Sequence, residues 1–169
     1  MLIGALTIFT LVTVAITPEA VGPEESTPAT DFSDLAAKAF PAEGGVNREY
    51  GDKLWSALYK LPQWYFLMTP KSMAKQMPSA QVIDGKGWFL AFTDAEKLQA
   101  YAKQNKNVDK KGNAYMMTMT PDQAVEFARK NSNGSVFGVR FNEGQAHGWF
   151  SPMRNLTIFP NYLRNKGLL

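Results

Sequence analysis

The first sixteen residues of the chain, MLIGALTIFTLVTVAI, contain no charged side chain and no proline. A helix over this segment would be about 24 Å long and apolar on every side, so it requires burial in a membrane or in protein. It is shorter than the roughly 20 residues that cross a bilayer unaided, and bilayer thinning or flanking residues would supply the difference. Three hypotheses follow: a membrane anchor, a cleaved signal peptide, or a helix in the protein's own core.

We favour the membrane anchor for residues 1–17. A signal peptide has a basic start and a small-residue cleavage site, whereas here no Lys or Arg precedes the apolar segment and proline follows its last threonine. Small hydroxyl side chains on one side of a membrane helix allow a second helix to approach closely. The side chains that we expect to make these membrane or helix–helix contacts are Thr7, Thr10, Thr13 and Thr17.

Charge is distributed unevenly along the chain. Residues 1–34 contain five acidic residues and no Lys or Arg, which leaves 18 basic and 10 acidic residues in the rest. Because basic flanks of membrane helices stay in the cytoplasm, the acidic flank places the body outside it, in a periplasmic or similar compartment. A basic body suits an anionic protein or lipid surface. Nucleic acid is the less favoured partner, since Trp64, Trp88 and Trp149 lie in predicted strands and are expected in the core.

Residues 18–46 form the predicted linker. They combine prolines with acidic and small polar residues, a composition that buries too little apolar surface to offset the entropy of ordering. Within them, residues 31–40 favour a short helix capped by Asp31 or Ser33. Its apolar side chains Phe32, Leu35 and Phe40 are candidates for docking on the body.

Residues 47–169 are predicted to form an α+β domain, with a mixed sheet of about five short strands and two to three packed helices. β-favouring runs bounded by turn residues indicate strands at 63–68, 80–83, 88–92, 114–119, 135–141 and 147–150. Asp84-Gly85 predicts the hairpin turn between the second and third of these runs. In the run 135–141, strict alternation places Phe137 on the same side as Val139 and Phe141.

Capping residues predict where the helices begin. Asn47 is suited to cap a helix that ends before Pro62. Thr93 and Glu96 match a capping box for a helix reaching about residue 104, and Thr120 with Gln123 matches a second box. Near the C-terminus, Pro160 predicts no more than one last helical turn.

The order of these motifs resembles the SseB N-terminal-domain family of small bacterial α+β domains. The likeness covers roughly residues 48–153 and rests on three segments, LPQWYFL from residue 61, WFLAFTDAEKL from residue 88 and GVRFNEG from residue 138. Two departures are Glu143, where the family has a proline in an Asn-Pro-Gly turn, and the apolar N-terminal segment. The resemblance implies a non-catalytic binding module with no established ligand.

The composition excludes several kinds of site. The chain has no cysteine and one histidine, which rules out thiolate zinc sites, iron–sulfur clusters and multi-histidine metal sites. We therefore expect no cofactor, no metal and no enzymatic activity. The remaining enzyme hypothesis uses His147 as a base beside Glu143, although no nucleophile accompanies them.

A partner surface is predicted at the basic loop that contains Lys103, Lys106, Lys110 and Lys111, with a merely solvated loop as the alternative. The sequence as a whole predicts a non-enzymatic accessory protein tethered to a membrane beside a larger membrane protein assembly. Its basic body would bind a partner protein outside the cytoplasm. The alternative is a cleaved, soluble periplasmic or secreted ligand-binding domain.

Overall fold

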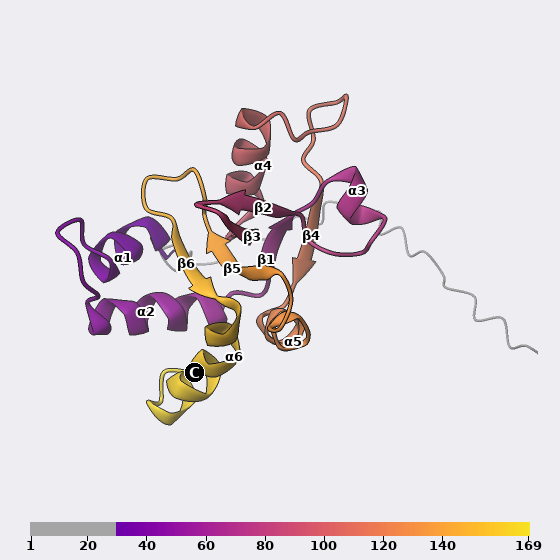
Figure 1. Cartoon of the computed structure of the whole chain (residues 1–169). Helices are drawn as coiled ribbons and strands as arrows, with labels where there is room; N and C mark the ends of the chain where they lie inside the picture. Colours follow the sequence, from indigo (N-terminus) through magenta and orange to yellow (C-terminus); the bar gives the residue numbers. More distant parts are fainter. Residues whose placement is uncertain (1–29) are drawn as a thin grey trace, which may run out of the picture.

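A mixed six-stranded sheet forms the centre of the fold in the computed structural model, which describes residues 30–169 (Figure 1). The strands follow the order β4-β1-β3-β5-β6, and β2 pairs with β3 beside this path. All pairings are antiparallel except that of β3 with β5. The strands are β1 (Trp64–Leu67), β2 (Ala80–Ile83), β3 (Lys86–Phe92), β4 (Met116–Met119), β5 (Val136–Phe141) and β6 (Trp149–Pro152).

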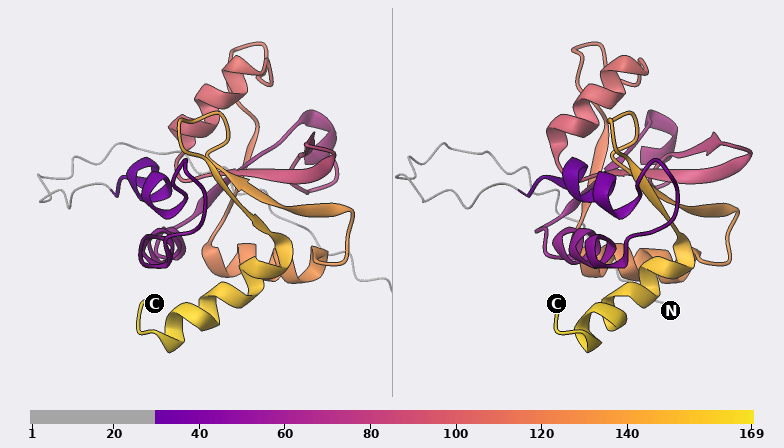
Figure 2. Two further views of the ribbon diagram at one scale, coloured as in Figure 1. Left: turned by 60° about the vertical axis from the view of Figure 1, so that its left-hand side comes forward. Right: turned by 90° about the vertical axis from the view of Figure 1, so that its left-hand side faces the viewer.

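Helices lie on both faces of this sheet (Figure 2). They are α1 (Phe32–Ala39), α2 (Arg48–Tyr59), α3 (Pro70–Met73), α4 (Ala95–Gln104), α5 (Pro121–Asn131) and α6 (Met153–Asn165). Of the helices in residues 30–169, only α4 packs on the first face, where it contacts β1 and β3; we call this the α4 face. The opposite face packs against α1, α2, α5 and α6. The predicted α+β class with a mixed sheet is confirmed. The described residues form six strands and six helices, more than the five strands and two to three packed helices that were predicted.

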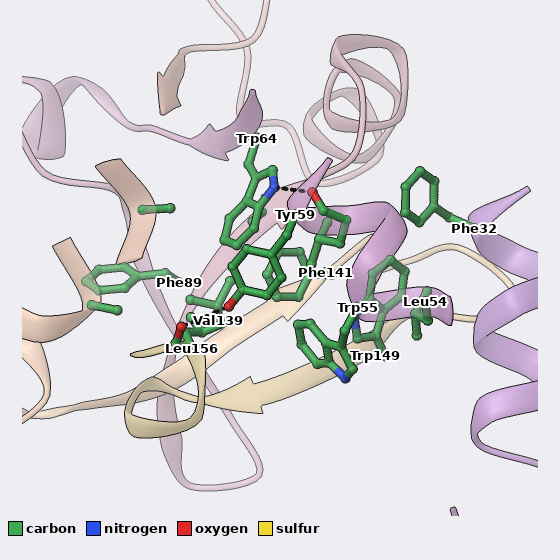
Figure 3. Close-up of a cluster of buried hydrophobic side chains, with 14 of the residues drawn as sticks. Phe32, Leu54, Trp55, Tyr59, Trp64, Phe89, Val139, Phe141, Trp149 and Leu156 are labelled. Carbon is green, nitrogen blue, oxygen red and sulfur yellow. Dashed lines mark hydrogen bonds between the residues drawn. The ribbon is translucent and has the colours of Figure 1, made fainter. Parts of the chain in front are cut away.

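Aromatic side chains fill the core between the sheet and the four helices (Figure 3). Trp64 is fully buried and meets Phe141 edge-on, with ring centroids 5.2 Å apart. Trp149 lies between Phe141 and Phe32 and stacks with both, at 5.4 and 6.1 Å. Rings of this size bury large apolar areas, so this cluster contributes much of the free energy of folding.

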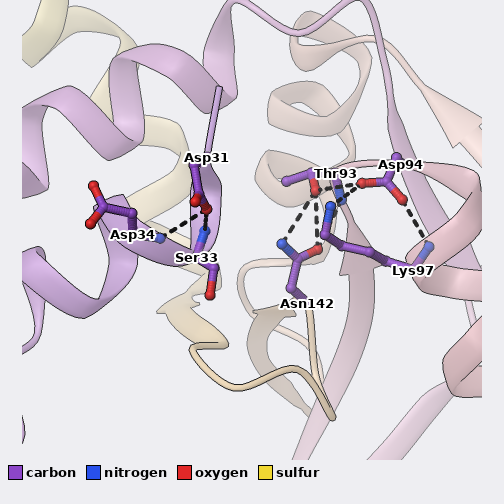
Figure 4. Close-up of polar contacts among 7 residues, drawn as sticks. All are labelled: Asp31, Ser33, Asp34, Thr93, Asp94, Lys97 and Asn142. Atoms are coloured by element: carbon purple, nitrogen blue, oxygen red, sulfur yellow. Dashed lines mark hydrogen bonds and ion pairs between the residues drawn. The ribbon is translucent and has the colours of Figure 1, made fainter. Parts of the chain in front are cut away.

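Helix α1 belongs to the same core. The Asp31 carboxylate accepts hydrogen bonds from the backbone N–H groups of Ser33 and Asp34, each at 3.0 Å, which confirms the predicted cap (Figure 4). Phe32 is 6% exposed. The folded unit therefore includes α1, inside the segment 18–46 predicted as linker. The predicted anchor, residues 1–17 with Thr7, Thr10, Thr13 and Thr17, lies outside the described residues.

Helix α6 shows that the prediction of a single C-terminal turn was wrong, because the helix continues for 13 residues through Pro160. Proline has no N–H, so it cannot donate the helical hydrogen bond to the carbonyl four residues earlier, that of Leu156. The Tyr59 hydroxyl donates to this carbonyl instead, at 2.9 Å. Burial raises the pKa of Tyr59 above its usual range, so the hydroxyl stays protonated and able to donate.

The capping box predicted at Thr93 and Glu96 was also wrong, because Asp94 is the N-cap of α4. The Asp94 carboxylate accepts the Lys97 N–H at 2.8 Å. Thr93 is buried at the end of β3, where its N–H donates to the side-chain oxygen of Asn142 at 3.0 Å (Figure 4). Thr93 and Asn142 thus join the ends of β3 and β5.

Local turn chemistry was otherwise predicted correctly. Asp84 and Gly85 join β2 to β3 with positive φ angles of 52° and 74°, as both central residues of a two-residue type I′ hairpin turn require. Thr120 and Gln123 form the expected capping box of α5. Asn47 caps α2 through its side-chain oxygen.

Candidate interaction surfaces

The four lysines of the predicted partner surface are all exposed at one end of the sheet. Lys103 lies on the last turn of α4, and the other three, Lys106, Lys110 and Lys111, lie on the loop between α4 and β4. Helix α4 runs along the sheet toward the end where β1 stops and β4 starts (Figure 1). The structure therefore keeps the four predicted residues on one continuous segment at that end.

Helix α3 brings two further lysines to the same end of the sheet. Asn107 donates a side-chain hydrogen bond to the Met68 carbonyl at 3.1 Å, which holds the α4–β4 loop beside the segment that leads into α3. Lys71 and Lys75 are exposed on and just after this short helix. Sequence analysis missed both residues, because the contact joins segments far apart in the chain and leaves no local signal.

Exposed methionines accompany these lysines. Met73 on α3 is 49% exposed, Met77 after it is 36% exposed, and Met116 at the start of β4 is 38% exposed. Met116 is exposed, whereas Met119 of the same strand is buried. We define the lysine surface as these three methionines with Lys71, Lys75, Lys103, Lys106, Lys110 and Lys111.

Asp109 shapes the loop of the lysine surface. Its carboxylate accepts hydrogen bonds from the backbone N–H groups of Asn113 and Lys111, both at 2.8 Å. The bond from Asn113 is the main reason that the pKa of Asp109 is below its ordinary value. The loop carboxylate is therefore occupied by backbone groups, and none of the six lysines forms an ion pair within residues 30–169.

A second candidate surface lies on the α4 face beside α4, where β5 and β6 have no helix packed over them in the described part of the chain. Trp88 is buried here, and the rings of Phe137 and Phe150 meet it edge-on with centroids 4.9 and 5.3 Å away. These two phenylalanines are 40% and 53% exposed. We call Trp88, Phe137, Arg140 and Phe150 the aromatic platform.

The Arg140 guanidinium lies beside two rings of the platform, 5.3 Å from the centre of Trp88 and 5.9 Å from that of Phe150. One of its terminal nitrogens lies 3.1 Å from the Glu143 carboxylate, and the other lies 3.6 Å from that of Asp84. Two carboxylates therefore pair with this one guanidinium. The arginine side chain is only 18% exposed, and its ring contacts and ion pairs restrict its conformation before any partner binds.

A β-bulge explains why sequence alternation placed Phe137 on the wrong face. Gly87 pairs with Val136, and the next residue, Trp88, pairs with Gly138, so the register skips Phe137. An extra residue of this kind turns its side chain away from the regular alternation. Phe137 consequently faces Trp88 on the α4 face, with the Lys86 ammonium 4.3 Å from its ring centre.

The structure gives no geometric support to the hypothesis of His147 as a base. His147 is exposed in the β5–β6 loop, and its side chain makes no hydrogen bond or ion pair within residues 30–169, while Glu143 is paired with Arg140. Among the same residues, no cluster of acidic or histidine side chains is arranged to hold a metal ion. None of the described helices has the length and apolar character to cross a membrane.

No family model and no curated protein matches this chain.

Proposed function

We propose that this chain is a non-enzymatic accessory protein, tethered to a membrane through residues 1–17, whose body binds a partner protein through the aromatic platform. The exposure of Phe137 and Phe150 around Trp88 and Arg140 carries this proposal. Large aromatic residues and arginine are the residue types on which binding energy concentrates in protein interfaces. A rigid platform also loses little conformational entropy when a partner binds.

The tether is proposed on the sequence alone, from the uncharged first sixteen residues. The acidic flank that follows supports a body outside the cytoplasm, beside a larger membrane assembly. The likeness of the sequence to the SseB N-terminal-domain family supports a binding role rather than catalysis. Membership of that family is part of what we propose. Cleavage of the leader, which would release a soluble ligand-binding domain, is the alternative function.

Site-specific photo-crosslinking tests the platform. A photoreactive amino acid at position 150 should form a discrete adduct with one protein in native membranes. The matched control is position 158, because Ile158 is also exposed, at 50%, but lies on α6 against the opposite face of the sheet. Adduct formation at position 158 and not at position 150 would contradict the proposed site.

A further inference from the structure

We propose that the lysine surface docks on the anionic headgroups of a lipid bilayer. This interaction is separate from partner binding at the aromatic platform, since the two surfaces share no residue. It also does not depend on the tether, because all of its residues lie within the folded body.

The positive charge of the lysine surface favours an anionic membrane. Six exposed lysines lie on two segments that the Asn107–Met68 hydrogen bond joins, and none has an ion-pair partner in the described chain. Asp109, the acid within the α4–β4 loop, is engaged by backbone N–H groups. Close to an anionic membrane each lysine raises affinity by about fivefold. Several lysines at one end of a small domain therefore suffice to orient that end toward a negative surface.

The exposed apolar side chains of the lysine surface also favour a bilayer. Met73 lies between Lys71 and Lys75 in the chain, Met77 follows them, and both methionines are exposed. Methionine is flexible and apolar, which suits the irregular boundary between headgroups and acyl chains. Lysine side chains can lay their methylene stems along such a boundary while the ammonium reaches the phosphates.

A hollow beside α3 adds room for a headgroup. It has a volume of about 400 Å³, and Lys71, Lys75 and Met77 are among the residues that line it. Phe89 and Val136 of the sheet line another part of it. A phosphate seated at its rim would meet two ammonium groups, while apolar atoms enter the hollow.

The basic residue type favours lipid over protein as the occupant. Lysine is depleted in protein–protein interfaces, whereas arginine and aromatic residues are enriched. The six basic residues of the lysine surface are all lysine, and the large apolar residues among them are methionines. Arginine and exposed aromatic rings instead occur together at the platform. The two surfaces thus have the compositions expected for two different occupants.

Fluorescence from a single labelled cysteine tests the proposal on the full chain. The chain contains no cysteine, so Ala74→Cys gives one attachment point for an environment-sensitive dye, exposed immediately after α3. We expect its emission to rise on vesicles of equal phosphatidylcholine and phosphatidylglycerol, but not on phosphatidylcholine alone, and to fall again with salt. Asn161→Cys on α6 is the matched control and should report no change.

Charge removal at two places separates a local surface from bulk charge. Lys103, Lys106, Lys110 and Lys111 are replaced by Gln in one variant, and Arg48, Lys60, Arg154 and Arg164 in the control, all exposed in the native chain. By the position-74 signal, the first should lose at least about tenfold in affinity for anionic vesicles and the control less than about twofold. Equal losses, or a response to soluble polyglutamate but not to anionic vesicles, would overturn the proposal.

Discussion

Tyr59 and Pro160 should be energetically coupled, because the tyrosine hydroxyl provides the hydrogen bond that the proline cannot. The Leu156 carbonyl is the shared acceptor, in a residue that is 1% exposed. Replacing Tyr59 with Phe removes the donor and leaves this carbonyl buried. A buried polar group without a partner costs about 1–3 kcal/mol, so we expect a loss of this size in the free energy of unfolding.

Pro160→Ala changes the cost of that substitution. Alanine restores a backbone N–H four residues after Leu156, and this N–H can donate to the same carbonyl in the normal helical pattern. In the Pro160→Ala background, Tyr59→Phe should therefore cost only about 0.5–1.5 kcal/mol, the net value of one ordinary hydrogen bond. The expected interaction energy in the double-mutant cycle is about 1 kcal/mol.

Urea unfolding of the native chain and the three variants measures this cycle, with the transition followed by circular dichroism. Equal slopes of the free energy against urea concentration would show that the variants unfold from the same native state. If the two substitutions add within experimental error, the hydroxyl does not substitute for the missing N–H. The explanation of why α6 continues through proline would then be wrong.

Three further predictions concern the packing of α1, the contact between the ends of β3 and β5, and the cap of α4. Phe32→Ala should lower the free energy of unfolding by about 3 kcal/mol in urea titrations, because α1 packs in the core; a loss below about 1 kcal/mol would mean that it does not. In the same assay, Asn142→Ala should lower the free energy of unfolding more than Asn142→Gly. Both substitutions leave the Thr93 N–H without its acceptor, but only alanine is strained at a φ of 52°. Asp94→Ala should cost about 1 kcal/mol at pH 7 in pH-dependent unfolding. Burial alone would raise the pKa of Asp94, but hydrogen bonds from Lys97 lower it overall, so this difference should shrink as pH falls below about 4 and the carboxyl protonates; a difference that grows on acidification would refute it.

Local chemistry is what sequence analysis predicted correctly. The Asp84-Gly85 turn and the Thr120 capping box depend on residues within four positions of one another. The same is true of the Asp31 cap. Such motifs satisfy nearby backbone groups wherever the element is finally packed, so the sequence contains all the information they require.

Long-range contacts explain the errors. Thr93 looked like an N-cap, but Asn142, 49 residues away, accepts its N–H. Pro160 looked like a helix end, but Tyr59 reaches across from α2 to satisfy the freed carbonyl. The bulge that exposes Phe137 exists only through pairing with β3. None of these partners can be identified from the residues next to the motif.

The candidate surfaces also divide into residues that local sequence signals predicted and residues that only long-range contacts bring together. The lysines of one loop were predicted because they are close in sequence, whereas Lys71 joins them through the contact between Asn107 and Met68. The platform was missed because its residues come from three strands. Its residue Phe150 follows a loop rather than a recognisable motif. Predicting it would have required the strand order and the bulge in advance.

Gentle detergent extraction of native membranes shows whether a tethered body holds a partner through the aromatic platform. The chain is purified with its companions, and mass spectrometry determines its N-terminus and theirs. We predict an intact Met1 and a stoichiometric companion that is retained with Ile158→Ala but lost with Phe137→Ala/Phe150→Ala. A trimmed N-terminus with no companion, or a companion retained by the platform variant, would contradict the proposed function.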